Sequence, residues 1–156
     1  MAFKHRTLHE LAAHVEHYAA TELKRKRLTA SLRVCAIILY GSAAKYHLGM
    51  VPEYRDFDLN VFLRKTARYR TGDARHLNRR GRCWSASHFM GKGVDVMFNV
   101  VGASQDWRNS VAKRASSRWC RIKAAPIVEV HPEIVVYRRY GAPAARGMGP
   151  RRVLGG

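Results

Sequence analysis

An unbroken apolar segment, Val34 to Tyr40, constrains the fold of this chain more than any other feature of its sequence. The segment is too short for a buried helix and is rich in residues that favour strands, so it predicts a strand buried on both faces. Gly41 and Ser42 end this strand, and a short helix is expected from Ala43 to Leu48. The chain is therefore expected to contain an interior strand that ends in a glycine–serine turn.

Segments on both sides of this strand show helical and strand patterns in turn. Before it, Thr7 and Glu10 form a capping box for an N-terminal helix, and apolar residues follow at helical spacing. After it, Asp56 to Leu63 alternates between a polar and an apolar face, as a half-buried strand does. Trp84 to Met90 and Val94 to Val101 then flank a Gly-Lys-Gly sequence, which predicts a hairpin.

The remaining segments predict shorter elements. The arginine-rich stretch from Arg64 to Arg82 is expected to be a loop with a short helix around Ala74 to Arg80. Ser104 can cap a helix that runs to about Ala115, with Asp106 in its first turn. Further short strands are expected near Trp119–Lys123, Ile127–Val130 and Ile134–Tyr137.

The order of these elements predicts one domain and a tail. A chain of 156 residues supports a single domain. The mixture of helices and strands predicts an α/β (α+β) domain over residues 1–140, built on a small mixed sheet with an N-terminal helix. Residues 141–156 consist largely of Gly, Ala, Pro and Arg, which predicts a flexible basic tail.

The formal net charge of +18 is large for one domain. Such a basic surplus favours a polyanionic partner or substrate, such as nucleic acid or a nucleoside triphosphate. Membrane binding is not expected, because no segment is long and apolar enough to span a bilayer and none joins a basic face to a broad apolar one. The three cysteines are widely separated and the N-terminus lacks a secretory signal, so a cytoplasmic location is expected.

Basic and histidine residues give weaker indications of where a ligand lies. The arginines between Arg64 and Arg82 are the best candidates for a surface that faces nucleic acid, because single-stranded RNA needs a cationic groove. Lys24 to Arg27 ends the N-terminal helix, where a solvated basic end that complements the helix dipole is preferred to an RNA contact. His47 could approach a bound triphosphate, but a surface-loop position is preferred.

Acidic residues inside apolar strands are the strongest indication of chemistry. Asp56 and Asp58 share one face of their strand, about 7 Å apart at Cα, so their carboxylates can converge on one or two hard cations. Asp95 is a lone acid in the second apolar strand. Aspartate is depleted in strands. The alternatives are solvated acids or salt bridges to arginines for the pair, and a satisfied edge-strand carboxylate for Asp95.

The glycine–serine turn adds a third feature to these acids. Backbone N–H groups at Gly41 and Ser42 can point at a phosphate, because the turn follows a strand and opens a helix. The pair alone is weak support, since many strand–helix junctions carry these residues to make the turn. The combination of the turn with three strand aspartates is more specific than any single feature.

This combination resembles the nucleotidyltransferase superfamily, whose fold is shared with DNA polymerase beta. The resemblance lies in ILYGSAAKYHLGMVPEYRDFDLNVFL and GVDVMFNVV, which fall within residues 34–101, and the chain is closest in size to minimal nucleotidyltransferases. The family motif is a hydrophobic strand ending in Gly-Ser or Gly-Gly, then an Asp-x-Asp or Asp-x-Glu strand, then a later strand aspartate. It falls here on Gly41, Ser42, Asp56, Asp58 and Asp95.

The resemblance implies a palm-like mixed sheet and transfer of a nucleoside monophosphate from a triphosphate such as ATP to an acceptor hydroxyl, with pyrophosphate leaving. It implies that Gly41 and Ser42 hold the triphosphate, and Lys45 could add charge there. It also implies that Asp56 and Asp58 ligate two Mg²⁺ (or Mn²⁺) ions, and that Asp95 completes the site of the ion that activates the hydroxyl.

The chain also departs from compact members of that family. The segment between Ser42 and Asp56 is longer, and Lys45-Tyr46 stands where many members have Arg-Gly. The chain lacks room for the helical second domain that grips the base in larger members. A homodimer or a helical partner protein is therefore expected to supply base selectivity and the acceptor site.

The charge and the acids leave three functions open. The leading one is an active nucleotidyltransferase, with RNA as a candidate acceptor. The first alternative is a non-catalytic nucleic-acid-binding module that retains the fold. The basic surplus favours that module, but a pure binder would gain from losing its three aspartates. The second alternative is a regulatory partner of the toxin–antitoxin type.

Overall fold

The computed structural model describes residues 2–75, 77, 84–110, 126–131, 135–137 and 151–152. Its helices are α1 (His5–Arg25) and α2 (Gly41–His47). Its strands are β1 (Leu32–Tyr40), β2 (Phe57–Lys65), β3 (Trp84–Phe89), β4 (Lys92–Val101), β5 (Ile127–His131), β6 (Val135–Tyr137) and β7 (Arg151–Arg152). A further helical segment begins at Trp107 and is described as far as Ser110. Among the described helices, none has the length and hydrophobicity needed to cross a membrane.

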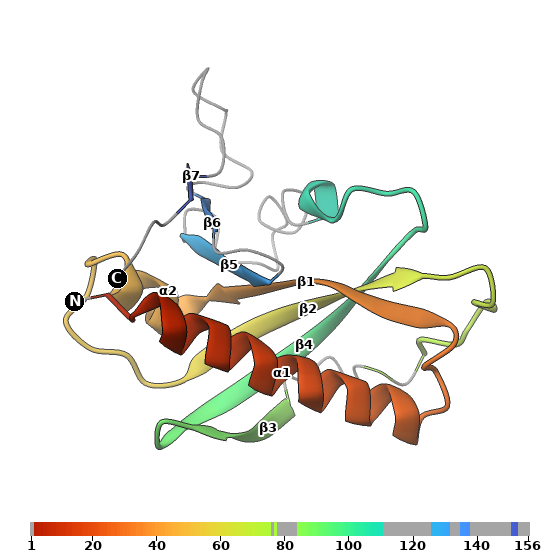
Figure 1. Cartoon of the computed structure of the whole chain (residues 1–156), viewed down its shortest axis with the longest axis horizontal. Coiled ribbons are helices and arrows are strands. Elements are labelled where there is room, and N and C mark those ends of the chain that lie inside the picture. Colours follow the sequence, from red (N-terminus) through yellow and green to blue (C-terminus); the bar gives the residue numbers. More distant parts are fainter. Residues whose placement is uncertain are drawn as a thin grey trace.

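The strands form one mixed sheet in the order β3-β4-β2-β1-β5-β6-β7. β2 and β4 run parallel, and the other neighbouring strands run antiparallel. The mixed α and β architecture with an N-terminal helix is therefore confirmed (Figure 1). β7 lies within the predicted tail and pairs with β6, whereas the rest of residues 141–156 lies outside the described residues.

The helix α1 covers one face of the sheet (Figure 1). Its apolar stripe repeats every three to four residues, which places one side of the helix in the core. The buried residues of that stripe are Leu8, Leu11, Ala12, Val15, Ala19 and Leu23. They belong to one cluster with the inward residues of β2, which are Phe57, Leu59, Val61 and Leu63. The predicted apolar face of that strand is therefore confirmed.

A second, smaller apolar cluster lies on the opposite face of the sheet. It contains Ala36 and Ile38 of β1 with Phe62 and Trp107, whereas Ile37 and Leu39 belong to the α1 side. Because successive strand residues point to opposite faces, β1 contributes to both clusters. The prediction of a strand buried on both faces is therefore confirmed.

The N-terminus of α1 does not use the predicted capping box. The helix begins at His5, its cap residue Lys4 makes no side-chain capping hydrogen bond, and Thr7 lies inside the first turn. Glu10 instead accepts a hydrogen bond from Nε of Arg6, at 2.9 Å. The preceding residue Phe3 is buried, and packing of this residue, rather than a cap, determines where the helix starts.

His47 anchors that N-terminal arm, so the prediction of a surface-loop position was wrong. It is the last residue of α2 and is buried, and its Nδ1 accepts a hydrogen bond from the backbone N–H of Phe3 at 3.1 Å. Burial lowers the pKa of His47, which keeps the imidazole neutral and able to accept. The ring of Phe3 also packs against Tyr54 and Phe57, with centroid distances of 5.0 and 5.6 Å.

The helical segment after β4 starts later than predicted. It begins at Trp107, and Oδ1 of Asp106 accepts a hydrogen bond from the backbone N–H of Arg108 at 2.9 Å. Asp106 is therefore the cap, and Ser104 is not. At Ser104 the chain is still in a turn, which the hydrogen bond from Gln105 N–H to the Gly102 carbonyl closes. The predicted continuation to Ala115 lies outside the described residues.

The expected strand near Trp119–Lys123 and most of the expected helix around Ala74–Arg80 also fall outside the described residues. The strands expected near 127–130 and 134–137 are present as β5 and β6, so those two predictions are confirmed.

The predicted hairpin is confirmed, but its turn has two residues and starts one residue earlier than the predicted Gly-Lys-Gly turn, so Lys92 and Gly93 belong to β4. Phe89 of β3 pairs with Lys92 of β4, and the residues between them, Met90 and Gly91, have φ values of 51° and 74°. Positive φ at both central residues matches the right-handed twist of the strands. Gly91 adopts this conformation without strain, but Met90 carries a side chain that disfavours it.

Met90→Asn is expected to stabilise the protein by about 0.5–1 kcal/mol, because asparagine tolerates the left-handed region and the Met90 side chain is 60% exposed. Urea unfolding at neutral pH measures the change. Gly91→Ala is the matched control, since it places a side chain at the other positive φ and should destabilise the turn. A loss of stability in Met90→Asn would contradict this account of the turn.

Candidate active site

Parallel pairing of β2 and β4 brings two of the predicted site residues together. Asp58 is the register partner of Asp95. Partners on adjacent strands point to the same side of a sheet. Both aspartates therefore lie on the face opposite α1, since their neighbours Phe57 and Val94 belong to the α1 cluster.

The third predicted acid lies at the entrance to β2. Asp56 immediately precedes β2, because the strand begins one residue later than the predicted start at Asp56. A Cβ atom at Gly93 of β4 would lie 3.2 Å from Oδ1 of Asp56, so this carboxylate sits beside the start of β4. We refer to Asp56, Asp58 and Asp95 as the aspartate cluster.

The glycine–serine turn meets the aspartate cluster at Gly41. A Cβ atom at this position would lie 2.5 Å from Oδ2 of Asp58, closer than Cβ atoms approach other non-bonded atoms. Gly41 also has φ of +68°, a conformation that glycine adopts without the Cβ penalty. Glycine is therefore required here twice, once for the backbone turn and once for the close approach of the carboxylate.

Burial and the negative charge of neighbouring acids raise the pKa values of two members of the aspartate cluster. Burial raises the pKa of Asp58 to about 6, with further contributions from the negative charges of Asp95 and Asp56 and a smaller opposing effect of Arg55. Burial also raises the pKa of Asp95, and the charge of Asp56 raises it further. Carboxylates that disfavour one another's ionised form become compatible with full ionisation when a cation lies among them.

Asp58→Asn is expected to stabilise the metal-free protein by about 1–2 kcal/mol at pH 8, after allowance for the partial exposure of the carboxylate. The folded-state pKa near 6 lies above the unfolded value near 4. The neutral form of Asp58 is therefore favoured in the folded state. The stability that this raised pKa gives the wild type is complete below about pH 4 and is lost as the pH rises through about 6. Urea unfolding in EDTA at pH 4 and pH 8 measures the difference.

Glu53→Gln controls for the loss of one negative charge, because Glu53 is exposed on the loop before β2. Its effect should be small and similar at both pH values. A stability gain for Asp58→Asn that is as large at pH 4 as at pH 8 would show that charge is not its cause.

The predicted phosphate-binding residues lie on α2 beside the aspartate cluster. Gly41 and Ser42 are its first two residues, and Lys45 lies one turn further on and is half-buried. Oγ of Ser42 accepts a hydrogen bond from the backbone N–H of Arg55 at 3.2 Å, so its hydroxyl proton is still available for donation. This contact fixes the end of the long loop against the first turn of α2.

Arg55 was missed by the sequence analysis. It is exposed, precedes Asp56, and is close enough to Asp58 to lower its pKa against the larger effects that raise it. Its position beside Ser42 makes it a second cation that can attract a triphosphate. The sequence contains no signal for this role, because Arg55 is one arginine among many and only the fold places it at the site.

Other polar residues continue along the same face. Asn60 lies two residues beyond Asp58 on β2 and accepts a hydrogen bond from Nδ2 of Asn99 at 2.9 Å. Glu129 of β5 is fully buried and lies opposite Ile38, which in turn lies opposite Asn60. Glu129 was not predicted as a site residue. Its sequence signal is the same as that of Asp95, a lone acid in an apolar strand.

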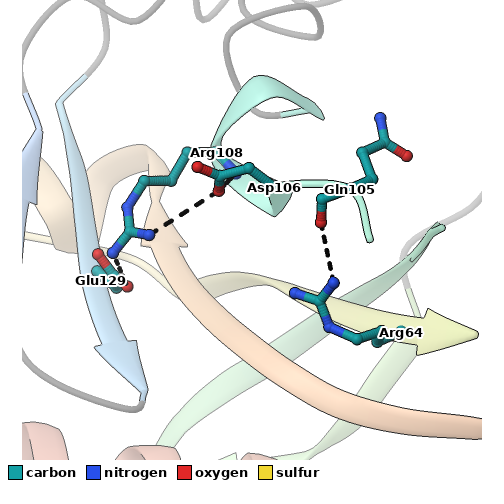
Figure 2. A network of polar contacts seen from close by, with 5 residues as sticks. All are labelled: Arg64, Gln105, Asp106, Arg108 and Glu129. Atoms are coloured by element: carbon teal, nitrogen blue, oxygen red, sulfur yellow. Dashed lines mark hydrogen bonds and ion pairs between the residues drawn. The ribbon is translucent and has the colours of Figure 1, made fainter. Parts of the chain in front are cut away.

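Arg108 holds the start of the last helical segment against Glu129 (Figure 2). Its guanidinium lies 3.5 Å from Oε1 of Glu129 and 3.9 Å from Oδ1 of Asp106. It also stacks over the ring of Trp107, 4.8 Å from the centroid. A buried carboxylate needs such a cation, because an uncompensated charge in the interior is strongly destabilising. Arg108 and Glu129 therefore form a structural connection on the same face of the sheet as the aspartate cluster, at β5.

The chemistry of the aspartate cluster suits a hard divalent cation. Among the described residues, no three His, Cys, Asp or Glu side chains already stand as a set of metal ligands. Carboxylate oxygens are the donors that Mg²⁺ prefers, and the raised pKa values of Asp58 and Asp95 beside other negative charges are of the kind that a cation relieves. The residues present therefore fit the implied metal.

Comparison with protein-family models, curated proteins and solved structures finds no match for the chain. The geometry of the aspartate cluster and the motif resemblance are therefore the two observations that support a function for this chain.

Proposed function

We propose that the protein is a metal-dependent nucleotidyltransferase that moves a nucleoside monophosphate from a nucleoside triphosphate to an acceptor hydroxyl. One observation carries the proposal: the parallel β2–β4 pair places Asp58 beside Asp95, and Gly41 lets the turn into α2 approach Asp58 closely. The three motif elements, which are far apart in the sequence, thereby meet on one face of the sheet. Neither a solvated strand end nor a salt bridge to arginine accounts for this convergence.

The aspartate cluster would hold Mg²⁺ or Mn²⁺. When bound, such ions neutralise charge on the attacking and leaving oxygens of an in-line displacement. Asp58 is the most buried of the perturbed carboxylates, and Gly41 and Tyr40 border it on the β1 side. It is therefore the acid whose position the fold fixes most tightly.

The chain's own residues divide the remaining tasks. Ser42 would donate its hydroxyl proton to a phosphate oxygen, and Lys45 and Arg55 would balance the charge of the triphosphate. The acceptor oxygen would attack the α-phosphorus as the bond to the bridging oxygen breaks, and pyrophosphate would leave. Asp95 would accept the hydroxyl proton from its position beside Asp58.

A specific observation also supports the alternative of a non-catalytic nucleic-acid-binding module, namely the charge of +18. A pure binder, however, would be improved by losing the aspartate cluster, because those charges repel phosphates. We therefore prefer the enzyme, with a homodimer or a helical partner as the source of base selectivity.

Label transfer tests the proposed function. The protein is incubated with Mg²⁺, each α-labelled nucleoside triphosphate in turn, and RNA, protein or small-molecule acceptors. Transfer that requires Mg²⁺ and stops in EDTA is the expected result. Asp58→Asn protein, purified in the same way, controls for contaminating transferases. Equal transfer by both proteins, or none by the wild type with any acceptor, would contradict the proposal.

A further inference from the structure

Two basic stretches that are far apart in the sequence meet at one end of the sheet. The turn after α1 and the loop after β2 are joined there, because the backbone N–H of Thr66 donates to the carbonyl of Ser31 at 3.0 Å. The hydroxyl of Thr66 also donates to the carbonyl of Ala30, at 2.5 Å. Both stretches lie at the right-hand end of Figure 1, where α1 finishes.

We call the cationic residues of this region the basic end. Its members are Lys24, Arg25, Lys26, Arg27, Arg33, Lys65, Arg68, Arg70 and Arg75. All are exposed except Lys26 and Lys65, which are half-buried. Within the described stretches 22–33 and 65–75, the acids are Glu22 and Asp73. Glu22 pairs with Arg25 at 2.9 Å, and Asp73 accepts from the backbone N–H of Arg70 at 2.8 Å. The basic end therefore keeps a large positive surplus.

Arg64 does not belong to this surface, although it was among the arginines expected to face nucleic acid. Its Nη1 donates to the backbone carbonyls of Gly102, Ala103 and Gln105, at 3.3, 3.1 and 2.9 Å. Figure 2 shows the contact with Gln105. Its guanidinium therefore ties the loop after β4 to the sheet. By contrast, its register partner Arg33 is exposed and shares the face of the aspartate cluster.

The sheet thus separates charge along its strands. The aspartate cluster lies where β2 begins, and the basic end lies where β2 finishes. Asp58 and Lys65 are seven positions apart on this strand. At about 3.3 Å per residue, the two regions are about 23 Å apart. A polyanion attracted to the basic end is therefore held well away from the acids that would repel it.

We propose that the basic end binds single-stranded nucleic acid at a point several nucleotides from the end that reaches the aspartate cluster. The binding itself is independent of the proposed function, and only the placement of the strand end rests on it. A stacked strand advances about 3.4 Å per nucleotide, so 23 Å corresponds to about seven nucleotides. A single strand suits this surface, because proteins that bind single strands without sequence preference contact the phosphate backbone through cationic side chains along the strand.

Fluorescence anisotropy with labelled oligouridylates of 4, 8 and 16 nucleotides tests the proposal. The wild type is expected to bind the 16-mer at least about 10-fold more tightly than the 4-mer. The variants are Lys24→Gln/Arg27→Gln on the α1 side and Arg68→Gln/Arg70→Gln on the loop side. Each is expected to weaken 16-mer binding by about 10-fold and to reduce the slope of log affinity against log salt by about 1.4, or about 0.7 for each lost phosphate contact.

Lys4→Gln/Arg6→Gln is the matched control. It removes two exposed cations from the same helix, at the end far from the basic end, and should change binding less than 2-fold. Equal weakening by control and test variants would show diffuse attraction and overturn the proposal. So would equal binding of all three oligonucleotides, or stronger binding to phosphatidylserine vesicles or an acidic peptide than to RNA.

The same titration separates this proposal from the proposed function. Asp95→Asn removes a negative charge from the region that receives the strand end, so this variant should bind the 16-mer at least as tightly as the wild type, and weaker binding would contradict the separation of the two regions. RNA binding as expected, without label transfer by the wild type, would support the basic end and contradict the enzyme. Label transfer together with unchanged binding by both test variants would contradict the basic end alone.

Discussion

Asp95→Asn is expected to lower nucleotide transfer by about 100-fold or more, the scale of losing metal or general-base assistance. The substitution keeps the size and shape of the side chain but removes its charge. Asp95 stands beside Asp58 in the β2–β4 register, where the resemblance assigns it to the attacking hydroxyl. Asp56 and Asp58 remain, so the variant should still bind metal and nucleoside triphosphate. Single-turnover label transfer and calorimetry with Mg²⁺ and the triphosphate measure the two effects separately.

Glu53→Gln provides the control for Asp95→Asn, because it removes an acid from the exposed loop and should leave transfer unchanged. Transfer by Asp95→Asn at the wild-type rate would refute the three-carboxylate mechanism and would favour the binding module. Loss of both binding and transfer would instead assign Asp95 to substrate binding and refute its separate role at the hydroxyl.

Gly41→Ala is expected to destabilise the protein by about 3 kcal/mol and to abolish divalent-metal binding. The new Cβ would meet Oδ2 of Asp58 at 2.5 Å, and the backbone there has φ of +68°. The positive φ alone costs about 1–2 kcal/mol. The remaining cost comes from moving the carboxylate, which spoils the aspartate cluster. Urea unfolding and Mn²⁺ titration measure the two consequences.

Gly49→Ala is a closely matched control for this substitution. Gly49 has φ of +71°, nearly the same as Gly41, but nothing lies within 4 Å of its would-be Cβ atom. It should cost about 1 kcal/mol from backbone strain and leave metal binding intact. If both variants bind Mn²⁺ equally well, the close approach of Gly41 to Asp58 does not hold the site together.

Local periodicity was enough to predict the strands that carry the site. The alternation after Asp56 located β2 to within one or two residues, and the unbroken apolar run located β1. These patterns arise because strand residues alternate between two environments, so they are present in any short window of sequence. The parallel pairing of β2 with β4 has no such local trace, and only the motif resemblance anticipated that Asp95 would stand beside Asp58.

The predictions that failed concern positions that tertiary contacts determine. Phe3 and His47 hold the start of α1, and Asp106 replaced Ser104 as a cap because the preceding turn ends later than expected. Arg55 is positioned at the site by the hydrogen bond from its backbone N–H to Oγ of Ser42. Except for the cap, these contacts join residues that are far apart in the sequence. The position of a helix cap is itself uncertain by one or two residues when it is predicted from sequence.

The parallel pairing of β2 with β4 also determines when the site can form during folding. The hydrogen bond between Asn60 and Asn99 joins residues 39 positions apart, and the hairpin β3–β4 must form or dock to complete that pairing. Closing such a loop costs entropy before any contact compensates for it, so long-range parallel pairing is slow compared with helix or hairpin formation. Asp95 is therefore kept apart from Asp56 and Asp58 in the unfolded chain and in early intermediates. Under the proposed function, a newly made chain would acquire divalent-cation affinity only in the late, cooperative step that closes the sheet, and metal binding would then be a direct kinetic probe of that step.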